Sequence, residues 1–295
     1  MSEIHLIEVG LRDGLQSVKT LIPTKTKATA VRMLAKSGLS HIQVAAFVHP
    51  KIVPQMADAE ALIHEVGMLP GITLSALILN KKGLDRALAT GISAVDLSFS
   101  ASDLHSRANT RLSLERARQD TREMIHTAKA QGLKVRLGIQ CAFGHPKEPH
   151  IAAESILDSV IAFQGEGVDE IALADSAGLA RPHNIKDLVL KVKPLIADLP
   201  LILHLHDTHG YGMANFLEGL NCGIRHFDTA FGGLGGCPFI PGAKGNLGTE
   251  AVIHYLKDQD YDCSVTDIAP IESTTQLIAK HIQKTRQTSY EGATL

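Results

Sequence analysis

The sequence predicts one closed barrel of eight parallel strands, each followed by a helix, an α/β fold of the (β/α)8 TIM-barrel type. Short apolar runs of strand length alternate with longer helix-patterned segments from one end of the chain to the other, which is the order of a parallel sheet. Several runs follow a glycine that fits the left-handed residue ending a helix. The length of 295 residues is normal for one such barrel. An open, doubly wound sheet is the alternative, and it explains an eighth strand less naturally.

The expected elements can be placed along the chain from these runs. The strands are Ile4–Val9, His41–Phe47, Ile72–Leu79, Ala94–Ser98, Lys134–Cys141, Glu170–Ala174, Leu201–His206 and His226–Phe231. Helical spacing of apolar residues marks segments between them, such as Lys25–Lys36, Ala57–Val66, Lys82–Ala89, Leu112–Ala130, Ala152–Gln164 and Asn184–Ile196. The glycines that announce strands are Gly38, Gly91, Gly132, Gly167 and Gly223.

No Pro/Ser-rich boundary divides the chain, so we expect a single domain over residues 1–295. The barrel should cover about residues 4–258, followed by a C-terminal helical extension at about residues 262–286. Within this extension, Val265–Lys284 has the apolar spacing of an amphipathic helix. That helix could cover one end of the barrel or lie in a dimer interface, and we expect a homodimer or a higher homo-oligomer.

Composition excludes several classes of partner. The net charge is −2 and no basic run occurs, so neither nucleic acid nor a membrane surface is an expected partner. No apolar stretch is long enough to span a bilayer, and the N-terminus lacks the pattern of a targeting peptide. Four scattered cysteines without a C-x-x-C pair indicate free thiols in a reducing compartment. We therefore expect a cytoplasmic protein.

The strongest sign of chemistry is the pair His204 and His206 at the end of the seventh expected strand. Side chains alternate faces along a strand, so both imidazoles point to the same side while Leu205 points away. Two neutral imidazoles on one face can bind one cation. For an isolated His-x-His motif, two hydrogen-bonded core histidines are an equally good interpretation.

Other polar residues gather at the carboxyl ends of the expected strands, where barrel enzymes build their sites. Arg12 and Asp13 follow the first strand, although such a dipeptide alone is more often a surface ion pair. Gln43 lies near the end of the second strand, while Arg136 and Asp175 belong to the fifth and sixth. The glycine-rich segment 232–246 follows the eighth strand and could form a lid or a simple flexible connection.

Four of these residues would converge on one rim of the barrel as a mixed nitrogen and oxygen ligand set: Asp13, His204, His206 and Asn246. The set contains no thiolate that would favour zinc, and it leaves room for water or substrate oxygens. It suits a divalent cation such as Mg²⁺ or Mn²⁺, with Co²⁺ or Zn²⁺ allowed by the softness of imidazole. Asp207 follows the histidines directly and is expected to orient them.

Six motifs extend a resemblance over nearly the whole chain: Arg12-Asp13-Gly14-Leu15-Gln16, Phe47-Val48-His49-Pro50-Lys51, Val53-Pro54-Gln55-Met56, His204-Leu205-His206-Asp207-Thr208, Gly233-Leu234-Gly235-Gly236-Cys237-Pro238 and Gly245-Asn246-Leu247. Together they resemble the 3-hydroxy-3-methylglutaryl-CoA (HMG-CoA) lyases, a branch of the metal-dependent TIM-barrel lyases and Claisen-type synthases. The Arg-Asp-Gly and His-x-His elements are shared by the wider superfamily. The Gly-Leu-Gly-Gly-Cys-Pro segment is much more specific to the lyases.

The resemblance implies a retro-Claisen cleavage of a 3-hydroxyacyl-CoA, such as HMG-CoA, to acetyl-CoA and a 3-oxoacid such as acetoacetate. It implies that Asp13, His204, His206 and Asn246 bind the cation, and that Arg12 stabilises the enolate oxyanion. The expected catalytic residues are Arg12, Cys237, His204 and Asp175, with His204 or Cys237 transferring protons. The expected substrate-binding residues are Arg12, Gln16, Gln43 and Arg136.

One position departs from the family pattern. The family typically reads Glu-Ala-Thr/Ser-Ser on the second strand, where this chain has Gln43-Val44-Ala45-Ala46. An amide cannot accept a proton or add negative charge, so the sequence alone predicts poor cleavage of HMG-CoA and faster cleavage after Gln43→Glu. The alternatives are a Claisen-type acyltransferase that condenses acetyl-CoA with an oxoacid, and a non-catalytic metal-binding relative.

Overall fold

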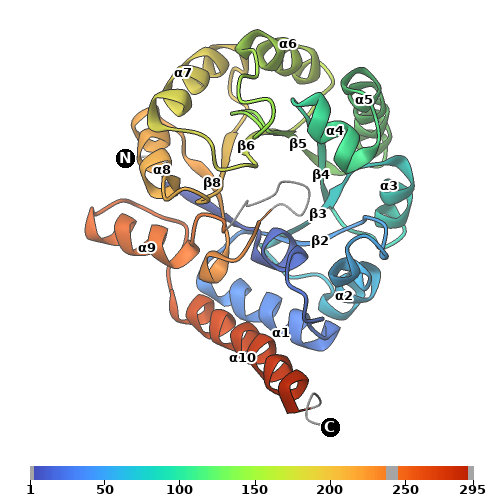
Figure 1. Cartoon of the computed structure of the whole chain (residues 1–295), viewed down its shortest axis with the longest axis vertical. Coiled ribbons are helices and arrows are strands. Elements are labelled where there is room, and N and C mark those ends of the chain that lie inside the picture. Colours follow the sequence, from blue (N-terminus) through green and yellow to red (C-terminus); the bar gives the residue numbers. More distant parts are fainter. Residues whose placement is uncertain (1–2, 237–244, 292–295) are drawn as a thin grey trace.

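A computed structural model describes residues 3–236 and 245–291, with side chains described up to residue 283. Its parallel strands close into one barrel in the order β1 to β8, and β8 pairs back onto β1 (Figure 1). The predicted fold is therefore confirmed. The strands are β1 (His5–Glu8), β2 (His41–Ala46), β3 (Thr73–Ile78), β4 (Ala94–Ser100), β5 (Lys134–Gln140), β6 (Glu170–Asp175), β7 (Leu201–Leu205) and β8 (His226–Thr229). Each overlaps the apolar run predicted for it.

Helices surround the ring of strands (Figure 1). They are α1 (Thr24–Leu34), α2 (Ala59–Val66), α3 (Lys81–Leu88), α4 (Asp103–Thr110), α5 (Leu114–Ala130), α6 (Ala153–Gln164), α7 (Pro182–Val192), α8 (Gly212–Asn221) and α9 (Thr249–Asp258). Single helical turns connect them, namely η1 (Gly10–Gly14), η2 (Ala35–Ser37), η3 (Pro54–Met56), η4 (Lys193–Leu195) and η5 (Phe231–Gly233).

The segment after β4 forms two helices where the sequence predicted one. Ser102 caps α4 by accepting a hydrogen bond from the His105 N–H, and Ser113 caps α5 in the same way. Between them Arg111 takes a left-handed conformation with φ of 63°, which ends α4. The two serine caps explain why this segment splits, because each satisfies N–H groups that a continuous helix would pair internally.

The C-terminal helix α10 (Ala269–Glu291) begins four residues later than Val265 and runs beside α1 on the outside of the barrel (Figure 1). Ile271 and Ile278 are fully buried there. The segment leading into α10 docks on Gly38, where an added Cβ would lie 2.6 Å from the backbone oxygen of Ser264. Gly38 also has a φ of 93°, so glycine suits both the helix end and this close approach.

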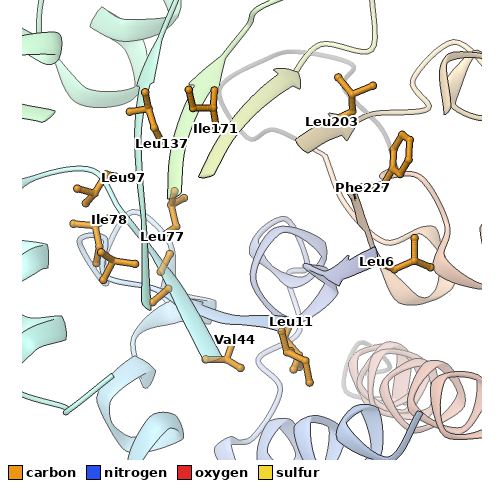
Figure 2. Close-up of a cluster of buried hydrophobic side chains, with 14 of the residues drawn as sticks. Leu6, Leu11, Val44, Leu77, Ile78, Leu97, Leu137, Ile171, Leu203 and Phe227 are labelled. Carbon is orange, nitrogen blue, oxygen red and sulfur yellow. The ribbon is translucent and has the colours of Figure 1, made fainter. Parts of the chain in front are cut away.

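The strands present two different faces. Val44, Leu97, Leu137, Leu203 and Phe227 belong to the hydrophobic core between the strands and the helices, and Figure 2 shows them around the ring. The residues next to them in sequence point into the barrel instead. They are Gln43, Asp96, Arg136, His204 and Asp228, and all five line one cavity. This alternation is the two-residue period of a strand, and it places a polar interior inside an apolar shell.

Candidate active site

Arg12 and Asp13 lie on η1, a turn of π-helix that follows β1. The backbone oxygen of Val9 accepts hydrogen bonds from the N–H groups of Arg12 and Asp13 at 3.1 and 2.7 Å. The tight turn needs Gly10, since an added Cβ would lie 2.6 Å from the ring of Phe231. The glycine-flanked sequence therefore turns both polar side chains toward the barrel rim.

Glu8 fixes this turn from the outer face of β1. Its carboxyl group accepts hydrogen bonds from the N–H groups of Gly10 (2.7 Å) and Phe231 (3.1 Å) and from the hydroxyl of Thr249 (2.7 Å). The side chain is fully buried, and burial raises the pKa of Glu8 to about 8. Glu8 thus ties η1 to η5 and α9, and sequence reasoning did not single it out.

Strand β7 brings His204 and His206 against Asp13. The two Nε2 atoms lie 3.1 Å apart, and Asp13 Oδ2 lies 3.5 Å from His206 Nε2 and 4.0 Å from His204 Nε2. All three side chains are buried, and their ligand atoms lie within 4.8 Å of one another. Burial would raise the pKa of Asp13, but the Arg12 guanidinium and the two histidines outweigh it and lower that pKa.

Asp228, on β8, sets the protonation of His204. Burial alone would raise the pKa of Asp228, but Arg136 and His204 lower it to about 2, so the carboxylate is ionised and can only accept hydrogen bonds. Its Oδ2 lies 3.0 Å from His204 Nδ1, which must therefore carry the proton. In the tautomer that carries its proton on Nδ1, His204 has a lone pair on Nε2, facing Asp13 and His206.

This donor set fits a divalent cation. A carboxylate behind the outer nitrogen of a ligating histidine is a common arrangement at metal sites, and Asp13, His204 and His206 direct one atom each to the same point. A proton on His206 Nε2 satisfies the two facing nitrogens, and a cation can replace it, because metal binding to imidazole displaces protons. The buried triad is thus consistent with a divalent cation.

Asn246, the fourth expected ligand, also reaches this point but presents its amide nitrogen. Asn246 Nδ2 donates to Asp13 Oδ2 at 2.7 Å and to the backbone oxygen of Leu234 at 2.9 Å. Its backbone forms a bridge to that of His206. Asn246 therefore lies at the site, and its oxygen becomes available to a cation after a half-turn of the amide.

A chain of buried hydrogen bonds continues from the triad around the interior of the barrel. Arg12 donates through Nη1 to Asp13 and through Nε to Gln43 Oε1. Gln43 Nε2 donates to Asp96 Oδ2. Arg136 donates to Asp96 Oδ1 and to Asp228 Oδ1, both at 2.6 Å. We call the residues Asp13, Arg12, Gln43, Asp96, Arg136, Asp228 and His204 the polar ring.

Sequence reasoning identified Arg12, Gln43 and Arg136 but missed Asp96 and Asp228. A signal was available, since each aspartate lies on a predicted strand in phase with the inner face and follows an apolar residue of the outer face. Burial alone would lower the pKa of Arg136, but Asp228 and Asp96 outweigh it and raise that pKa. Both aspartates are therefore held as partners of the buried guanidinium of Arg136.

The polar ring forms the floor of a cavity of about 330 Å³. Its walls combine apolar side chains, including Leu77, Leu79 and Leu112, with the polar Asn109 and Arg111. Arg111 is exposed and forms no ion pair within the part of the chain that the structure describes. The cavity has the size and mixed lining typical of a small-molecule site, and its rim carries a positive charge.

The structure places the other expected site residues as follows. Gln16 lines the cavity and donates to Asp13 Oδ1 at 2.8 Å. The buried carboxylate of Asp175 accepts from the N–H groups of Leu179 and Ala180 at 2.9 and 3.0 Å, and this residue is not among those lining the cavity. Asp207 does not orient the histidines as expected, because its carboxylate accepts from the N–H of Gly212 at the start of α8 (2.6 Å). Cys237 lies outside the described residues.

Comparison with known proteins finds relatives that cover most of the chain. Residues 3–279 match the HMGL-like family. The chain is 36% identical over 255 residues to the mitochondrial hydroxymethylglutaryl-CoA lyase of Macaca fascicularis, covering 86% of this chain and 78% of that protein. It is 34% identical over 282 residues to the cytoplasmic 3-hydroxy-3-methylglutaryl-CoA lyase of Mus musculus, covering 96% and 82%.

A solved structure agrees with this likeness. An HMG-CoA lyase from Acinetobacter baumannii, in complex with coenzyme A and 3-methylmalate, has a TM-score of 0.91 to this chain at 31% identity. The match covers 95% of this chain and 92% of that one. Among the described residues, no helix combines the length and apolar character needed to cross a membrane.

Proposed function

The chain belongs to the HMGL-like family and is an HMG-CoA lyase-like carbon–carbon lyase, and we propose that it cleaves HMG-CoA or a related 3-hydroxyacyl-CoA to acetyl-CoA and a 3-oxoacid such as acetoacetate. One observation carries the proposal. The triad of Asp13, His204 and His206 and the guanidinium of Arg12 line the same cavity, so a single bound acyl group can touch both.

The proposed site joins a cation to a positive side chain. Asp13, His204 and His206 would hold the cation, and Asn246 would add its amide oxygen. When bound, the cation supplies Lewis-acid polarisation of the substrate oxygens. The number of oxygen ligands favours Mg²⁺ or Mn²⁺, and the imidazoles also admit Co²⁺ or Zn²⁺.

In the proposed reaction the C3 hydroxyl gives up its proton to a base, and the C2–C3 bond breaks with its electron pair remaining on C2. C3 becomes the carbonyl carbon of the oxoacid, while C2 becomes part of the acetyl-CoA enolate. Arg12 donates hydrogen bonds to the enolate oxygen as its charge develops. An acid then protonates C2. His204 and Cys237 are the candidates for these proton transfers, and Asp175 stays a candidate catalytic residue.

Binding of the substrate would draw on the same cavity. We propose that Gln16, Gln43 and Arg136 contribute to substrate binding with Arg12, and that Arg111 attracts the anionic groups of an acyl-CoA. In support, the solved lyase from Acinetobacter baumannii was obtained in complex with coenzyme A. Arg111, which forms no ion pair with any described residue, adds a positive charge to the rim.

The test is release of acetyl-CoA from HMG-CoA by the purified protein supplied with Mn²⁺ or Mg²⁺. We expect metal-dependent release with equimolar acetoacetate. If no member of a panel of 3-hydroxyacyl-CoA thioesters is cleaved, the lyase proposal is wrong. Incubation with acetyl-CoA and an oxoacid, followed by measurement of free CoA thiol, tests the acyltransferase alternative in parallel.

We propose a single domain over residues 1–295 and a homo-oligomeric assembly, for which light scattering coupled to gel filtration is the test. We also propose a cytoplasmic location. The named relatives include cytoplasmic and mitochondrial enzymes, and the described cysteines Cys141, Cys222 and Cys263 are free thiols, which fits a reducing compartment. Microscopy of the tagged full chain tests the location.

A further inference from the structure

Gln43 makes two hydrogen bonds that require an amide. It is 1% exposed, its Oε1 accepts from Arg12 Nε, and its Nε2 donates to Asp96 Oδ2. A glutamate at this position could accept from Arg12 but could not donate to Asp96, because an ionised carboxylate only accepts. Turning the amide over would set its nitrogen against an Arg12 donor and its oxygen against a carboxylate. Both neighbours therefore fix the orientation of Gln43.

Asp96 supplies the negative charge behind this amide. It is 3% exposed and lines the cavity. Arg136 Nε donates to its Oδ1 at 2.6 Å, and the Ser75 hydroxyl donates to its Oδ2 at 2.8 Å, beside Gln43. With donors on both oxygens, Asp96 is held in one place as an acceptor. Asp96 Oδ2 is therefore held in a fixed position as the acceptor for Gln43 Nε2.

Asp96 reaches Arg12 through this glutamine. Arg12 has five N–H donors, and its bonds within the described residues use one to Gln43 and one to Asp13. Two fixed edges hold the plane of the guanidinium and leave its other donors for a ligand in the cavity. The direction in which Arg12 points thus depends on a carboxylate that does not contact it.

We propose that Asp96 is a positioning residue that orients Arg12 through Gln43, and that Gln43 is matched to Asp96. The inference rests on the proposed function, in which Arg12 stabilises the enolate oxygen. It reverses the expectation drawn from the sequence alone. The substitution Gln43→Glu would place a carboxylate against Asp96, where like charges repel and a donor is lost. The polar ring already holds three carboxylates, Asp13, Asp96 and Asp228, against the two guanidinium groups of Arg12 and Arg136.

The proposal makes a reciprocal prediction for a charge exchange. In Gln43→Glu/Asp96→Asn the carboxylate and the amide change places. The introduced glutamate accepts from Arg12, while the introduced asparagine donates to that glutamate and accepts from Arg136. We expect Gln43→Glu alone to lower kcat by roughly tenfold or more, as for one charge-assisted hydrogen bond. We expect Asp96→Asn to lower it similarly, and the exchange variant to recover most of the wild-type kcat.

The experiment measures kcat and KM for acetyl-CoA release, and Mn²⁺ affinity by calorimetry, for the full chain and the three variants. Mn²⁺ affinity should change by less than about threefold, because the cation ligands keep their contacts. The fall in kcat should exceed any rise in KM, because the disturbed donor acts mainly on the developing oxyanion. The matched control is Glu166→Gln. Glu166 lies in the turn before β6, at the end of the barrel opposite the cavity, and its carboxylate pairs with Arg122 and His126 of α5. Removing this charge should leave kcat unchanged.

A readout independent of turnover separates this proposal from the proposed function. The ¹⁵N–¹H signal of Arg12 Nε, assigned by its absence in Arg12→Gln, reports whether Gln43 holds that donor. The hydrogen of Arg12 Nε should exchange slowly with solvent in wild type and in the double variant Gln43→Glu/Asp96→Asn. In Asp96→Asn alone this hydrogen exchange should be at least about tenfold faster, the scale of one lost charge-assisted hydrogen bond.

The outcomes are distinguishable. If wild type cleaves no acyl-CoA but Arg12 Nε exchange follows this pattern, the proposed function fails while the positioning by Asp96 stands. If Gln43→Glu is as fast as wild type or faster, or if the exchange variant is no better than Gln43→Glu, the positioning proposal is overturned. Unchanged exchange of Arg12 Nε in Asp96→Asn would overturn it as well.

Discussion

The inner and outer faces of the same strands follow opposite rules. On β8, Phe227 faces outward and its ring meets Phe216 of α8 edge-on, with centroids 4.6 Å apart, while the adjacent Asp228 faces inward and binds Arg136 and His204. Strand β7 repeats the contrast, with Leu203 in the hydrophobic core and His204 in the polar ring. Adjacent residues of one strand therefore have different roles, because one packs in the hydrophobic core and the next lies in the polar ring.

The two faces contribute differently to the free energy of folding. The outer face gains free energy by removing apolar surface from water. The inner face pays desolvation for buried charges, and pairing only offsets that cost. Barrel interiors are usually filled by layers of bulky branched side chains. Here such a layer, formed by Ile7, Val9, Ala172, Ile202 and Ala230, is accompanied by charged residues that orient one another.

The largest expected effect is on the outer face. Phe227→Ala removes the ring packed on Phe216 and should lower the free energy of unfolding by roughly 3–5 kcal/mol. The control Phe227→Leu keeps most of the volume and should lose less than about 1.5 kcal/mol. Chemical denaturation measures both. A loss below about 1 kcal/mol for Phe227→Ala would show that α8 does not depend on this contact.

The next largest effect is on turnover and arises on the inner face. Arg12→Gln removes the charged donor beside Asp13 and should lower turnover by about a hundredfold or more, the scale of losing an oxyanion donor. Cation binding should be retained. Arg12→Lys should rescue little, because an ammonium cannot replace the fork of donors held by Gln43 and Asp13. Turnover near the wild-type value in Arg12→Gln would make Arg12 a structural ion-pair residue.

A smaller effect tests the metal site alone. His206→Ala removes one donor of the triad and should weaken Mn²⁺ binding by roughly tenfold or more, since even residues behind the ligands have effects of this size. The matched control is His209→Ala, an exposed histidine of the same loop, which should bind Mn²⁺ like wild type. Calorimetric titration measures both, and equal affinities would contradict the assignment of His206.

An effect of pH on stability is expected from Glu8, a buried carboxyl group on the outer face of β1. Its folded pKa of about 8 lies above the ordinary 4.5, so the folded state holds its proton more tightly. Stability from this group is therefore complete below about pH 4.5 and is lost as the pH rises through about 8. The loss should not exceed about 1.4 kcal/mol per pH unit.

Glu8→Gln isolates this contribution, because an amide can still accept from Gly10 and Phe231 and does not ionise. Denaturation of both proteins between pH 5 and 8 should show a shallower fall in stability for Glu8→Gln than for wild type. Parallel pH profiles would show that Glu8 titrates alike in the folded and unfolded chains, and that this carboxyl group adds no pH dependence to stability.

The barrel, the approximate strand positions and the core of the metal site could be predicted from the sequence alone. Apolar runs specify strands because both faces of a parallel sheet are covered, and the alternation of side chains put His204 and His206 on one face without any knowledge of their neighbours. The family membership also followed from local motifs such as Arg12-Asp13-Gly14. These features depend on residues close together in the chain.

The contacts between residues far apart in the chain could not be predicted in this way, because they depend on the tertiary structure. The sequence alone predicts that Gln43 weakens cleavage of HMG-CoA, because no local pattern shows that its partner Asp96 lies 53 positions further along the chain, on β4. Asp228 became the partner of His204 only when β8 paired with β7, and Asp175 turned to the backbone of its own loop. Strand pairing and the closure of the barrel set these contacts, because a buried charge takes whichever partner the neighbouring strands bring within reach.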